Sequence, residues 1–129
     1  MKLLTSTLRI ITVAFALIVA MPASANDTCT KEDAIEKVEI VITAIHYSEY
    51  YDSGGRKKQT GDANESNLEN KALAAIQKLY EYKWGDAIYK LEDISDKATA
   101  WADAPKPKMD DATEINSAVG DAIYCIMEL

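Results

Sequence analysis

The stretch CTKEDAIEKVEIVITAI, residues 29–45, combines a cysteine, a helix start and one apolar helical face. Thr30 and Asp33 have the spacing of a capping box, in which each side chain accepts a hydrogen bond from the other residue's backbone. Apolar residues then recur at spacings typical of one α-helical face, with Val41 widening it: Ile35, Val38, Ile42 and Ile45. The pattern predicts a helix that ends near Tyr51 or Asp52.

The chain before this helix has the features of a secretory signal peptide. A positively charged start precedes an apolar run, residues 10–20, and a triplet with small outer residues, 23–25. The run is shorter than the roughly 20 apolar residues that a permanent membrane span needs. We therefore expect the signal peptide, residues 1–25, to be cleaved off after Ala25. The remaining domain, residues 26–129, would be periplasmic or secreted, without a stable membrane anchor. An uncleaved anchor is the alternative.

The charge balance narrows the classes of partner. The chain has 14 basic and 21 acidic residues, a net charge of −7. Loss of the first 25 residues would remove Lys2 and Arg9 and leave 12 basic against 21 acidic residues, a net charge of −9. A field of that sign disfavours nucleic acid and anionic membranes and permits cationic partners. We expect no nucleic-acid partner.

Three further helices are predicted from the same periodicity. Residues 53–64 are polar, contain three glycines and predict a loop. A second helix is expected over about residues 65–83, a third over about residues 86–102, and a fourth from Asp110 or Asp111 onward. No segment has a convincing strand pattern, so the chain is predicted to be all-α.

The junction between the second and third helices looks like a tight hairpin. Gly85 suits the left-handed position after a helix, and Asp86 suits the cap of the next one. Helical spacing predicts these residues to face the core: Leu68, Ala72, Ala75, Ile76, Leu79, Tyr80, Ala87, Ile88, Leu91, Ile94, Ala98, Trp101, Ile115, Val119, Ala122, Ile123 and Ile126.

The two cysteines, Cys29 and Cys125, lie at opposite ends of the expected domain. Exported proteins retain disulfides, and two cysteines allow only one intramolecular pairing. In an up-down-up-down bundle the start of the first helix and the end of the fourth meet at the same end, where these cysteines would lie. We predict an all-α, up-down four-helix bundle closed by one disulfide. Free thiols are the alternative.

The sequence contains no recognisable catalytic set. His46 is the only histidine, and the motifs for a nucleophile elbow, a phosphate-binding loop and a zinc protease are missing. We expect no enzyme activity, no catalytic residues, no metal and no cofactor. Aromatic residues are better candidates for a binding surface, because Tyr and Trp combine an apolar body with a polar tip. They form two clusters: Tyr47, Tyr50 and Tyr51, and Tyr80, Tyr82 and Trp84.

A haem site is the alternative to a surface contact. Residues 86–107 resemble the middle of the cytochrome b-type bundle family, and this resemblance implies a haem held between helices by a Met and a His. His46 lies 17 residues after Cys29, and Met109 lies 16 residues before Cys125. Both would then lie about 25 Å from the disulfide end, which makes them the candidate ligands. The chain lacks the histidine that this family places in its last helix.

Two functional hypotheses follow from these features. The first is a small exported binding protein without enzymatic activity, of the inhibitor or immunity type. It would contact another exported protein through an aromatic cluster and its acidic surface. The alternative is a periplasmic carrier of a small ligand or haem that uses the bundle interior.

Overall fold

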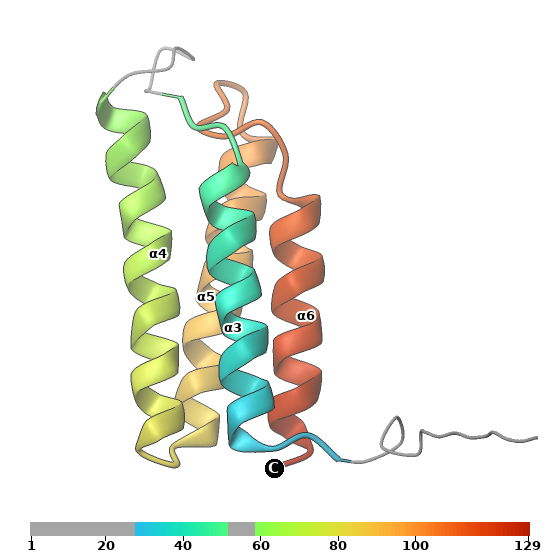
Figure 1. Cartoon of the computed structure of the whole chain (residues 1–129). Helices are drawn as coiled ribbons and strands as arrows, with labels where there is room; N and C mark the ends of the chain where they lie inside the picture. Colours follow the sequence, from blue (N-terminus) through green and yellow to red (C-terminus); the bar gives the residue numbers. More distant parts are fainter. Residues whose placement is uncertain (1–27, 52–58) are drawn as a thin grey trace, which may run out of the picture.

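The computed structural model describes residues 28–51 and 59–129, and within them the chain forms four α-helices and no β-strand (Figure 1). The helices are α3 (Lys31–Tyr47), α4 (Gln59–Tyr80), α5 (Trp84–Asp103) and α6 (Thr113–Met127). Both α3 and α5 pack against α4 and α6, so the helices stand in a ring. The predicted all-α bundle is confirmed. The predicted signal peptide, residues 1–25, lies outside the described residues.

The predicted capping box fixes the start of α3. The backbone N–H of Asp33 donates to the Thr30 hydroxyl at 3.1 Å, and the Thr30 N–H donates to the Asp33 carboxylate at 3.0 Å. The predicted end of this helix was wrong, because α3 stops at Tyr47 and Ser48 is already extended. None of the helices within the described residues combines the length and apolarity needed to cross a membrane.

The chain that follows α3 pairs with the chain that precedes α6. Tyr50 and Met109 form an isolated antiparallel bridge. The backbone N–H groups of Tyr51 and Asp110 donate across this pair to carbonyl oxygens at 2.8 and 3.0 Å. These hydrogen bonds explain why α3 ends early, since the backbone after Tyr47 finds its partners in another segment and not in a further helical turn.

The predicted disulfide joins α3 and α6 at the opposite end of the bundle. Cys29 and Cys125 are bonded, with Cα atoms 5.4 Å apart. Cys125 is 1% exposed and is part of the core, while the backbone N–H of Cys29 donates to the Glu128 carboxylate at 3.0 Å. The helix α3 is therefore attached to α6 at both of its ends.

Small and aliphatic side chains fill the centre of the ring. On α3 the buried stripe is displaced from the predicted one: Ala34, Val38, Val41 and Ile45 are fully buried, whereas Ile35 and Ile42 are only partly buried. The prediction that Tyr80 faces the core was wrong, since it is 58% exposed. The side chains of the other helices that have no exposed surface are Leu68, Ala72, Ala75, Leu79, Ala87, Leu91, Ile94, Ala98, Ile115 and Ala122, and Cys125 and Ile126 are 1% exposed.

The two helix boundaries predicted around α4 were also wrong. The helix begins at Gln59, so the predicted loop over residues 53–64 is helical from residue 59 onward. Polar composition lowers helix propensity only weakly, and tertiary context overrides it. At the other end, Tyr82 and not Gly85 takes the left-handed backbone, with φ of 62°. Gly85 lies in the first turn of α5, and the N-cap is Lys83, without a side-chain cap bond.

Removal of the disulfide is expected to destabilise the bundle strongly. The bond links residues 96 positions apart, and closing so long a loop destabilises the unfolded chain by about 4.7 kcal/mol in the chain-entropy model. Urea unfolding of the oxidised protein, the reduced protein and the double variant Cys29→Ser, Cys125→Ala measures this loss. Equal unfolding midpoints for the oxidised and reduced protein would contradict the assignment of the bond.

Candidate functional site

A groove follows the seam between α3 and α6. Its hollow has a volume of about 320 Å³. The lining positions recur every three or four residues on each helix, because one face of an α-helix repeats at that spacing. They are Ile40, Thr43, Ala44 and Tyr47 on α3, and Glu114, Ser117, Ala118 and Asp121 on α6.

Two large apolar side chains of α3 border this groove and are exposed to solvent. Ile40 is 53% exposed and Tyr47 is 77% exposed. Between Glu114 and Asp121, the α6 side carries two small residues, Ser117 and the nearly buried Ala118. Complete burial of a side chain of this size against a partner gains about 1.5–3 kcal/mol. The groove thus offers an apolar contact that folding has not used.

A second hollow, of about 250 Å³, adjoins the first at the end where α6 begins. Tyr47 and Glu114 line both hollows, and Ser48, Asp110 and Asp111 complete the second one. We name the two hollows together the Tyr47 groove. Its described lining includes four carboxylates and neither lysine nor arginine.

Asp111 is held in its charged form by the start of α6. Its carboxylate accepts hydrogen bonds from the Thr113 backbone N–H at 2.9 Å and from the Thr113 hydroxyl at 2.7 Å. These two bonds, the backbone one first, lower the pKa of Asp111 below its ordinary value. The acidic end of the Tyr47 groove therefore keeps this negative charge in mildly acidic solution.

The structure divides the first predicted aromatic cluster. Tyr47 lies in the groove, Tyr51 is half-buried, and Tyr50 is only 6% exposed. The Tyr50 hydroxyl donates to the Ile45 carbonyl at 2.7 Å. The prediction that Tyr50 belongs to an exposed binding surface was therefore wrong, because the bridge to Met109 carries its ring into the core.

The second predicted cluster is brought together, and a lysine that the sequence did not indicate lies against its rings, although Tyr80 and Tyr82 stay 58% and 66% exposed. The Lys31 ammonium lies 4.6 Å from the Tyr82 ring centre and 5.5 Å from that of Tyr80, and it donates to the Tyr82 hydroxyl at 3.3 Å. Trp84 is half-buried and meets Tyr82 edge to face, with ring centres 5.5 Å apart. Since a cation of the same chain already lies over these rings, the Tyr47 groove is the better candidate.

The predicted haem ligands, His46 and Met109, are placed in different surroundings. Met109 is fully buried, whereas the side chain of His46 is 65% exposed and faces two carboxylates of α4, Glu65 and Glu69. The pairing of these two residues around one haem stays a prediction that this arrangement does not support, because α3 turns His46 outward while the Tyr50 bridge holds Met109 in the core.

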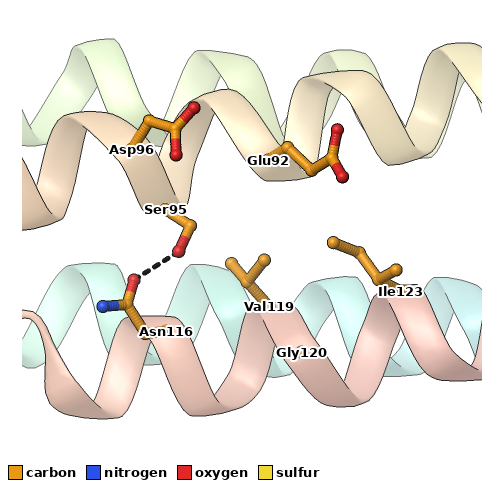
Figure 2. Close-up of a pocket in the computed structure, with 7 residues that line it drawn as sticks. All are labelled: Glu92, Ser95, Asp96, Asn116, Val119, Gly120 and Ile123. Carbon is orange, nitrogen blue, oxygen red and sulfur yellow. Dashed lines mark hydrogen bonds between the residues drawn. The ribbon is translucent and has the colours of Figure 1, made fainter.

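Another hollow, of about 440 Å³, lies between α5 and α6 (Figure 2). The Ser95 hydroxyl donates to the Asn116 side-chain carbonyl at 2.5 Å, and the Asn116 amide donates to the Thr99 hydroxyl at 2.9 Å. These polar groups therefore bond to one another, and the acids at the rim stand apart from them (Figure 2). Glu92, Asp96, Val119, Gly120 and Ile123 complete the lining.

Comparison of this chain with known protein families, with curated proteins and with solved structures yields no match. A fold of this kind can host many activities, so function has to be argued from the chemistry of the site. The Tyr47 groove combines unused apolar surface with a uniform negative charge, which is chemistry suited to binding.

Tyr50→Phe tests the burial of this ring. Burial, followed by the charge of Glu65, raises the pKa of Tyr50 above its ordinary value of about 10. The unfolded state loses this proton first as the pH rises, so the contribution to stability is complete below about pH 10 and is lost above it. We expect the Tyr50→Phe variant to lack this loss of stability at high pH. At neutral pH its free energy of unfolding should be lower by about 1 kcal/mol, because it loses one hydrogen bond.

Urea unfolding at neutral and at high pH measures both effects of Tyr50→Phe. Absorbance at 295 nm provides a control, because the folded variant and the folded natural protein should show the same tyrosine ionisation between about pH 8 and 11. A smaller absorbance change in the variant would contradict the burial of Tyr50.

Gly120→Ala is expected to stabilise the bundle. Gly120 lies inside α6 at an exposed position, and a methyl group there would meet no atom within 4 Å. The substitution removes backbone freedom from the unfolded chain and should raise the free energy of unfolding by about 0.5–1 kcal/mol. Thermal and urea unfolding measure the change, and a loss of stability would contradict the open surroundings of this position.

Proposed function

We propose that this protein is a small exported binding protein without enzymatic activity, of the inhibitor or immunity kind. It places its Tyr47 groove against a basic surface of another exported protein. The observation that supports this most directly is the pairing of two exposed apolar side chains, Ile40 and Tyr47, with a described lining whose charged side chains are all acidic.

The composition of the groove matches that of energetically important contacts. Tyrosine is enriched among the residues that dominate binding energy, because its ring buries a large area and its hydroxyl keeps a polar partner. Thr43, Ala44, Ser117 and Ala118 are small, so a protruding aliphatic or aromatic side chain of the partner would find room between the helices.

The charge selects the kind of partner. Glu114 and Asp121 flank the apolar part of the groove, and Asp110 and Asp111 lie at its end. With the whole chain at −7, this face would attract lysine- and arginine-rich surfaces and repel acidic ones. An enzyme cleft or a pore entrance lined with basic residues is the class of target that such a face could block.

The proposal also includes an up-and-down order of the helices and export of the chain. Residues 81–83 join α4 to α5 directly, and the disulfide and the Tyr50–Met109 bridge connect opposite ends of α3 and α6, as that order requires. The disulfide is compatible with an oxidising compartment. The expected signal peptide, residues 1–25, would deliver the domain to the periplasm or the medium.

A carrier that uses the bundle interior receives less support. The centre of the ring is occupied by side chains with no exposed surface, including Leu68, Leu91 and Ile115. The described hollows lie on the outside of the bundle between neighbouring helices. A ligand would have to displace packed side chains to enter.

The binding proposal predicts that two side chains carry the contact. Immobilised protein is incubated with the exported fraction of the cells that produce it, and the retained partner is purified for affinity measurements. Ile40→Ala and Tyr47→Ala should each weaken the dissociation constant by about 10- to 100-fold, because each removes apolar area from the centre of the contact. Asp121→Asn should slow association and reduce its dependence on salt.

Two matched variants separate this contact from general hydrophobicity. Leu73→Ala changes an α4 side chain that is 55% exposed, close to the 53% of Ile40, and Tyr89→Ala changes an α5 tyrosine that is 69% exposed. Both should bind as the natural protein does. Equal losses from these controls, or the retention of no partner at all, would contradict the proposal.

A further inference from the structure

Three potential metal ligands converge between α3 and α4, away from the Tyr47 groove residues of α6. They are the imidazole of His46 on α3 and the carboxylates of Glu65 and Glu69 on α4. One ligand atom from each lies within 4.8 Å of the other two. Within the described residues this is the one group of three or more His, Cys, Asp or Glu side chains that meets this distance.

The spacing of these atoms suits one small cation. His46 Nδ1 lies 3.1 Å from a Glu65 carboxylate oxygen and 3.8 Å from a Glu69 carboxylate oxygen. Zinc binds nitrogen and oxygen ligands at about 2.0–2.2 Å, so two ligands on a tetrahedral ion lie about 3.4 Å apart. The two measured distances lie on either side of that value, and small side-chain rotations would bring all three atoms onto one ion.

The local electrostatics also favour a cation. Glu65 and Glu69 stand one turn apart on α4, a spacing at which like charges destabilise a helix. Their side chains are only 23% and 31% exposed, so solvent screens the repulsion less than at an open surface. The charges of both residues also act on the hydroxyl of Tyr50, whose pKa is raised first by burial.

The ligand types narrow the choice of ion. Calcium and magnesium prefer sites built from oxygen atoms, whereas an imidazole nitrogen favours zinc and its first-row neighbours. Three protein ligands leave at least one position for water, in keeping with the 65% exposure of the His46 side chain. Ligation through Nδ1 would leave Nε2 to carry the ring proton.

We propose that His46, Glu65 and Glu69 form a binding site for a divalent first-row cation such as zinc, which clamps α3 to α4. The disulfide and the Tyr50–Met109 bridge both join α3 to α6, and neither holds α4. The cation would supply a cross-link on the other side of α3. None of its three ligands lines the Tyr47 groove, although the rings of His46 and Tyr47 meet edge to face with centres 5.5 Å apart.

The test uses zinc chloride and the purified full-length protein without an affinity tag, because a histidine tag would itself bind zinc. Isothermal titration at neutral pH should give one zinc per chain, and zinc should raise the unfolding temperature. His46→Ala and Glu69→Gln should each weaken zinc binding at least tenfold and abolish most of the thermal shift. Calcium chloride should give no comparable response.

Glu36→Gln is the matched control, since it removes the same charge from an exposed position of α3 about 15 Å along the helix from His46. It should bind zinc as the natural protein does. Circular dichroism establishes that each variant is folded, and Glu69→Gln keeps the shape of the side chain. Zinc binding that survives both ligand variants, or no binding at millimolar zinc, would overturn the proposal.

Discussion

The double attachment of α3 to α6 is the constraint on which the rest of the molecule depends. A covalent bond between Cys29 and Cys125 fixes one end of this pair, and the backbone bridge between Tyr50 and Met109 fixes the other. With both ends held, neither helix can slide or rotate freely along its partner. The register of the Tyr47 groove is therefore set by the fold, and a partner would lose little free energy in ordering it.

The packing of the bundle interior is the reason that both proposed binding sites lie on the surface. Alanines such as Ala34, Ala72 and Ala98 have no exposed area and allow neighbouring helices to approach closely, while leucine and isoleucine fill the remaining space. A core packed in this way contributes stability through close contacts between the helices. The chemistry that remains lies in the seams: acids and an exposed tyrosine along α3 and α6, and the His46 cluster between α3 and α4.

Apolar periodicity within each segment predicted the helices, whereas contacts between segments far apart in the sequence determine the geometry of the candidate site. Apolar periodicity and the positions of two cysteines were sufficient for the helices and their disulfide. The predicted face of α3 was displaced because its β-branched run offers several nearly equivalent faces, and only packing selects Ala34 over Ile35 and Ile42. Tyr50 was misassigned because its burial depends on Met109, far along the chain. The groove and the His46 cluster likewise require the register between helices, which no single helix encodes.

The closeness of Cys29 to the end of α6 has a consequence for the order of the helices. The Cα atoms of Cys29 and Cys125 are 5.4 Å apart, and the C-terminus lies beside the start of α3 (Figure 1). A short linker could connect the end of α6 to the segment that precedes α3, and the chain could be reopened at the turn where Tyr82 holds its left-handed backbone. In such a circular permutant α6 would lead directly into α3. The face that is assembled here from distant segments would become a single helical hairpin, the natural starting point for a minimal version of the protein.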